Sequence, residues 1–107
     1  MGYLIAKQNK PAAATPVDLY ACPNNMEFVA STLIVCNQAG ADSFRIVVSP
    51  TGLLTTAEMY IAYDTAISAN NFAEVTVGMT LVAGSIIRVY STLGNCSFSL
   101  FGKEIQI

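Results

Sequence analysis

The sequence predicts an all-β fold: a single antiparallel β-sandwich of eight to nine short strands, with Ig-like or jelly-roll topology. Sustained helical periodicity is hard to find along the 107 residues, whereas β-branched and aromatic residues are dense. Turn-forming residues recur roughly every eight to twelve positions, a spacing typical of sandwiches and barrels. The length suits one domain with one hydrophobic core.

The first half of the chain opens with a short apolar run, Tyr3–Lys7, and a connector, Lys10–Pro16. We therefore divide the chain into an N-terminal arm with a first short strand, residues 1–16, and a sandwich domain, residues 17–107. The next three expected strands are Val17–Ala21, Glu27–Asn37 and Ser43–Ser49. The weak sidedness of the second of these predicts a central strand covered on both faces.

The second half begins with a loop and at most one helical turn, near Leu53–Ala57. Further strands are expected at Glu58–Asp64 with a continuation over Thr65–Ser68, and then at Phe72–Val77, Met79–Val82, Ser85–Ser91 and from Cys96 onward. Gly78 is expected to break the pattern, and Leu93-Gly94-Asn95 is the tightest hairpin signal. Gly102 and the tail Lys103–Ile107 are expected to close the chain.

The composition is apolar and poor in charge. Apolar residues make up 53% of the chain and charged residues 11%, against about 25% charged in an ordinary soluble domain. This excludes disorder. The longest apolar runs, such as Leu33–Cys36 and Ile46–Val48, are far shorter than the ~20 residues of a membrane span. The shortage of charge suggests that partners cover part of the surface; the alternative is a surface kept soluble by Ser, Thr and Asn.

The charged residues and cysteines exclude several kinds of partner. The five basic residues form no run, which argues against nucleic acid and against an anionic membrane. Cys22, Cys36 and Cys96 form neither a disulfide framework nor a zinc-binding pair. We expect free, mostly buried thiols and folding in a reducing cytoplasm, without a secretory signal.

The sequence lacks the residue combinations that common catalytic sites require. The absence of histidine removes the Ser-His-Asp and Cys-His systems. Neither Cys36 nor Cys96 lies in a context that would activate a thiol. Acidic residues such as Glu58 and Asp64 are scattered, without calcium-binding spacing or an evident catalytic pair. We therefore expect no enzyme activity, no cofactor and no metal.

Two groups of residues are candidates for an interaction surface. The first is the arm, residues 1–16, which supplies Tyr3, Leu4, Ile5, Lys10 and Pro11. The second is the pair Tyr60 and Tyr63, which three-residue spacing would place on opposite faces of a strand. One tyrosine would then be exposed, as interface anchors often are, although a core tyrosine with a bonded hydroxyl is an equal alternative.

Several segments resemble small virion proteins of tailed bacteriophages, including cyanophages. They are Leu19–Pro23, Phe28–Asn37, Tyr60–Asp64, Ile67–Asn71, Gly78–Ser91 and Phe98–Ile105. The resemblance implies a capsid decoration (cement) protein that binds and stabilises the major capsid shell. It implies the major capsid protein and copies of itself as partners, in a homo-oligomer such as a trimer. The implied location is the virion, on the capsid surface, after synthesis in the host bacterial cytoplasm.

Two alternatives stay open. Some proteins of this kind belong to tail or fibre assemblies and touch host-surface glycans, which an exposed aromatic platform or a polar groove would favour. A small hydrolase would need a deep pocket holding two close carboxylates.

Overall fold

The computed structural model describes residues 4–50 and 52–107, with side chains described from Lys7 onward. This part of the chain holds one short 3-10 helix, η1 (Ala57–Met59), and eight strands: β1 (Leu4–Asn9), β2 (Val17–Ala21), β3 (Met26–Asn37), β4 (Asp42–Ser49), β5 (Tyr60–Ile67), β6 (Phe72–Leu81), β7 (Ile86–Ser91) and β8 (Cys96–Gln106). The all-β prediction is confirmed. The described residues include no helix with the length and hydropathy needed to cross a bilayer.

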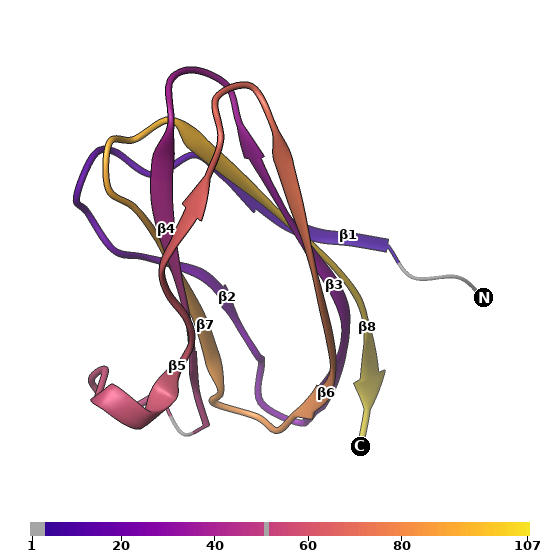
Figure 1. Ribbon diagram of the computed structural model, residues 1–107. Helices are drawn as coiled ribbons and strands as arrows, with labels where there is room; N and C mark the ends of the chain where they lie inside the picture. Colours follow the sequence, from indigo (N-terminus) through magenta and orange to yellow (C-terminus); the bar gives the residue numbers. More distant parts are fainter. Residues whose placement is uncertain (1–3, 51) are drawn as a thin grey trace.

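The strands form two four-stranded antiparallel sheets, in the orders β1-β8-β3-β6 and β2-β7-β4-β5, which pack as two layers (Figure 1). Strand β1 pairs with β8, β2 with β7, β3 with β6 and β4 with β5. This nesting is what results when one long hairpin is rolled into a sandwich. Of the two predicted topologies, the structure therefore has the jelly roll.

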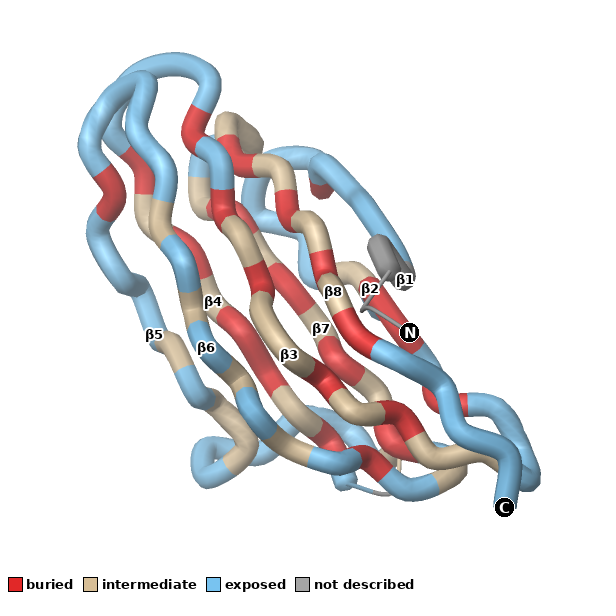
Figure 2. The backbone as a smooth tube through the Cα atoms, turned by 90° about the vertical axis from the view of Figure 1, so that its right-hand side faces the viewer, coloured by how far each residue is buried: buried red, intermediate tan, exposed pale blue. Residues whose placement is uncertain are grey.

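The core lies between the inner faces of the two sheets. Three phenylalanines at its centre, Phe28, Phe44 and Phe98, are at most 1% exposed. The rings of Phe44 and Phe98 meet edge to face across the layers, with centroids 6.2 Å apart. Figure 2 shows buried and half-buried residues alternating along β3, β4, β7 and β8, as expected of strands with one face in a core.

Three sequence-based expectations are corrected. Strand β3 buries only one face, because its other face, which includes Ile34 and Cys36, carries no second layer from the described chain. Gly78 does not break β6; it has a φ of 57° where β6 carries one extra residue opposite β3, so it forms a bulge. Residues 103–106 are not a tail after the last strand, because β8 continues through Gly102 to Gln106 by pairing with the start of β3.

All four edge strands carry a register irregularity. The shifts lie in the pairings of β1 with β8, β2 with β7, β6 with β3 and β5 with β4, the last with two. Of the two interior pairings, that of β4 with β7 has no shift and that of β3 with β8 has one, between Ala30 and Thr32. Because bulges twist an edge and interrupt its hydrogen-bonding groups, these edges are poor templates for another strand.

The N-terminal segment is bound to the sandwich by its own contacts. Residues 4–9 pair with β8 as an edge strand, and the side chains of Leu4 and Ile5 and the whole of Tyr3 lie outside the described residues. Lys10 donates to the carbonyl of Gly94 at 2.7 Å, Pro11 is buried, and the amide of Ala14 donates to the carbonyl of Ser91. Deleting residues 1–16 would therefore remove an edge strand together with any interaction the arm makes.

Candidate interaction face

Tyr60 and Tyr63 lie on the same face of the sandwich, which corrects the expectation of opposite faces. Their ring centroids are 4.8 Å apart at an interplanar angle of 85°. The reason is a one-residue slip of β5 against β4: Ala62 pairs with Ile46, but Tyr60 pairs with Val47. An extra residue between the two tyrosines reverses the alternation of side chains.

Arg45 on β4 extends this aromatic pair across the sheet. Its guanidinium lies 4.4 Å from the ring centroid of Tyr63 and 4.4 Å from that of Tyr90 on β7. It also donates to both carboxylate oxygens of Asp64, at 2.6 and 3.3 Å. This hydrogen bond raises the pKa of Arg45, which stays charged. The side chains form a continuous row from β7 across β4 to β5.

Arg88 on β7 holds a loop beside the row. It donates to Asp18 on β2 at 3.0 Å, to the carbonyl of Leu53 at 2.8 Å and to the hydroxyl of Thr55 at 3.1 Å. The same carbonyl also accepts a hydrogen bond from Ser49. Residues 53–55 are therefore held against the outer face of the sheet.

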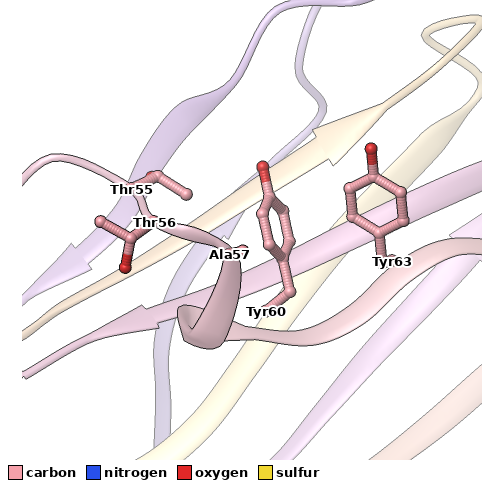
Figure 3. Close-up of a pocket in the computed structure, with 5 residues that line it drawn as sticks. All are labelled: Thr55, Thr56, Ala57, Tyr60 and Tyr63. Atoms are coloured by element: carbon pink, nitrogen blue, oxygen red, sulfur yellow. The ribbon is translucent and has the colours of Figure 1, made fainter.

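We name Tyr60, Tyr63, Tyr90, Arg45 and Arg88 the tyrosine face. It borders two cavities. The larger is an open hollow of ≈ 690 Å³ lined by Thr55, Thr56, Ala57, Tyr60 and Tyr63. The smaller is a pocket of ≈ 130 Å³ lined by Pro16, Arg45, Val47, Thr55, Tyr60, Arg88, Val89 and Tyr90. Figure 3 shows the two β5 hydroxyls pointing the same way, beside the loop. Among the described residues, no hydrogen bond engages the three tyrosine hydroxyls.

The charges of the tyrosine face balance. Its two arginines each form an ion pair, Arg45 with Asp64 and Arg88 with Asp18. Side-chain exposure ranges from 14% at Arg88 to 58% at Asp18, so these pairs are partly open to solvent. Such a surface combines one exposed ring, that of Tyr63, two half-buried rings, those of Tyr60 and Tyr90, and paired charges.

The outer face of the other sheet, β1-β8-β3-β6, has no comparable cluster of tyrosine and arginine among the described residues. Gln8 and Gln38 donate to the serine hydroxyls of Ser99 and Ser97 across its strands. Phe72 is an exposed aromatic residue there, at 67%. This face offers isolated apolar side chains among paired polar groups.

The buried thiols and the buried carboxylate stabilise the fold through packing and hydrogen bonds. Burial raises the pKa of the Cys22 and Cys96 thiols, which therefore stay protonated at neutral pH. Cys36 is exposed. Asp42 is buried, and its carboxylate accepts hydrogen bonds from Ser91 and from three backbone amides. No three His, Cys, Asp or Glu side chains gather to hold a metal within residues 4–50 and 52–107.

Sequence reasoning found two of the five members of the tyrosine face and missed Arg45, Arg88 and Tyr90. A signal was present: Arg45 alternates with Phe44 and Ile46, and Arg88 and Tyr90 flank Val89. Outward-facing arginine and tyrosine on neighbouring strands would have indicated a surface row, but only the pairing of β4 between β5 and β7 brings them together.

No family model, curated protein or solved structure matched the chain, so a function has to be inferred from this surface.

Proposed function

We propose that the chain is a structural protein of a phage particle, a capsid decoration protein that attaches to neighbouring protein subunits and stabilises the shell. The observation that carries this proposal is the tyrosine face. Tyr and Arg are enriched in protein interfaces, above all at the residues that dominate binding energy. The contacts between them hold these side chains in place before binding, which lowers the entropy lost on association.

Two further observations support docking through a face. The irregular edge strands disfavour the addition of a partner strand. Jelly rolls also recur in viral capsid proteins, although this is an argument from analogy because one fold hosts many functions.

A second candidate is a tail or fibre component that binds host-surface glycans. The observation that favours it is the ≈ 690 Å³ hollow, where Tyr60 and Tyr63 stand beside the hydroxyls of Thr55 and Thr56. Rings flanked by hydroxyls suit a sugar, and lectin domains also use jelly rolls. The exposed ring of Tyr63 and the half-buried ring of Tyr90 already stack on Arg45, which leaves less ring surface for a sugar and favours the protein partner.

The first test is co-sedimentation with phage shells assembled without this chain. The wild type is expected to bind saturably and to raise the temperature at which the shells disrupt. Tyr63→Ser is expected to weaken binding at least about 30-fold, as loss of an interface anchor does, whereas Phe72→Ser on the opposite face keeps wild-type binding. If the wild type does not bind shells but binds a neutral glycan on an array, the second candidate replaces the first.

A further inference from the structure

Two leucines are exposed at the edge of the tyrosine face. Leu53 is 60% and Leu54 87% exposed, in the loop between β4 and η1. The backbone is nevertheless held at two points: the Leu53 carbonyl accepts hydrogen bonds from Ser49 and Arg88, and the Pro50 carbonyl accepts one from Ser85 at 2.8 Å. An apolar pair on a fixed loop is a preformed projection that association would bury.

The ≈ 130 Å³ pocket lies directly beside this projection. Thr55, the residue after Leu54, lines it, together with Tyr60, Tyr90 and the β4 residue Val47. At about 30 Å³ for each water-sized group, the pocket accommodates about four such groups. A leucine side chain has four carbon atoms, so the pocket and the projection match in size and in apolar character.

We propose that two copies of this chain associate through their tyrosine faces, with Leu54 of each copy seated between Tyr60 and Tyr90 of the other. The Leu54 projection and the pocket lie side by side on one face of the chain. A two-fold axis between them therefore places Leu54 of each copy against the pocket of the other, so both contacts form at once. Within one chain Leu54 does not fill the pocket: its side chain is 87% exposed, and Ser49 and Arg88 hold the neighbouring Leu53 carbonyl.

The charges of the face permit this self-association. A face with a net charge would repel its own copy, but here each arginine is already paired with an aspartate of the same chain. The inference rests on the proposed decoration function and names the neighbouring subunit at the tyrosine face as a second copy of this chain. Dimerisation doubles the contacts of each unit with the shell, so loss of Tyr63 weakens shell binding by breaking the dimer.

Sedimentation equilibrium of the full chain tests the proposal. The wild type is expected to have twice the mass of one chain at micromolar concentrations, with little change between low and high salt. Leu54→Asp is expected to raise the dissociation constant about 1,000-fold, because it removes two equivalent contacts worth about 30-fold each. Phe72→Asp on the opposite face is the matched control and should remain dimeric, with circular dichroism confirming that both variants fold.

A mixing experiment tests the two-fold arrangement itself. Thr55→Trp should block the pocket, so it and Leu54→Asp should each be monomeric alone. Mixed, they should form a heterodimer weaker than the wild type, because one intact projection meets one intact pocket.

A wild type that is monomeric throughout, a trimer, or a Leu54→Asp variant that stays dimeric would each overturn the dimer. These results are separate from the shell experiment: a monomer that still binds shells refutes only the dimer, and a dimer that binds no shell refutes only the decoration function.

Discussion

Replacing Gly102 by alanine is expected to lower the free energy of unfolding by about 3 kcal/mol, at the upper end of the cost of overpacking a core. A Cβ atom at this position would overlap the ring of Phe28 and approach the carbonyl oxygen of Val29 to 2.6 Å. The Phe28 ring is 1% exposed and packs on Tyr20, with centroids 4.3 Å apart, so it has no space to retreat. The backbone oxygen cannot move without breaking the pairing of β3 with β8.

Urea denaturation of the variant measures this loss. Gly40→Ala is the matched control, because a Cβ at Gly40 meets nothing within 4 Å. Its stability should stay within about 0.5 kcal/mol of the wild type. Equal stability of the two variants would show that β3 and β8 do not approach as closely as described.

Removal of the Asp42 carboxylate is expected to cost about 3 kcal/mol, since it leaves one buried and three partly buried donors without an acceptor. Asp42 accepts hydrogen bonds from the Ser91 hydroxyl at 2.6 Å and from the amides of Ser43, Leu93 and Asn95 at 2.7, 2.9 and 3.2 Å. These bonds fasten the start of β4 to the turn between β7 and β8. We expect Asp42→Ala to lose this stability, measured by urea denaturation at neutral pH.

Asp64→Asn is the control for Asp42, since Asp64 is exposed and forms a surface ion pair, which is worth about 0–1 kcal/mol. Asparagine also tolerates the positive φ of 48° at this position. A loss at Asp64 as large as that at Asp42 would contradict the assigned role of the buried carboxylate.

The contribution of Asp42 should depend on pH in one direction. Burial alone raises its pKa, but the hydrogen bonds from Ser91 and the backbone amides outweigh burial and hold the pKa below its ordinary value of 3.8. A carboxyl with a lowered folded-state pKa stabilises the fold fully above its unfolded pKa, about 3.9. The difference in stability between the wild type and Asp42→Ala should therefore be constant near neutral pH and shrink as the pH falls below about 4.

The fold could be predicted from sequence because its signals are local. Alternation such as that of Cys96, Phe98 and Leu100 marks one buried face of a strand. Leu93-Gly94-Asn95 marks the turn between β7 and β8, but the prediction of a hairpin there was wrong, because these two strands lie in opposite sheets and do not pair. The choice of the jelly roll over an Ig-like order could not be made in this way, since it depends on which distant strands pair.

The candidate face was only partly predictable for the same reason. The rule of alternation placed Tyr60 and Tyr63 on opposite faces, and a bulge that arises from the pairing of β5 with β4 reversed it. The stacking of Arg45 between Tyr63 and Tyr90 likewise requires three strands from separate parts of the chain. The close packing at Gly102 could not be predicted either, because nothing local shows that Phe28 fills the space above it.

A cryo-electron microscopy map of the phage particle that contains this chain tests the central claim most directly. Our proposal predicts jelly-roll density on the outer surface of the shell, at a fixed number of copies per capsid subunit, with the tyrosine face covered by a neighbouring protein chain. Density confined to the tail, or a shell-bound copy whose tyrosine face is open to solvent, would contradict it.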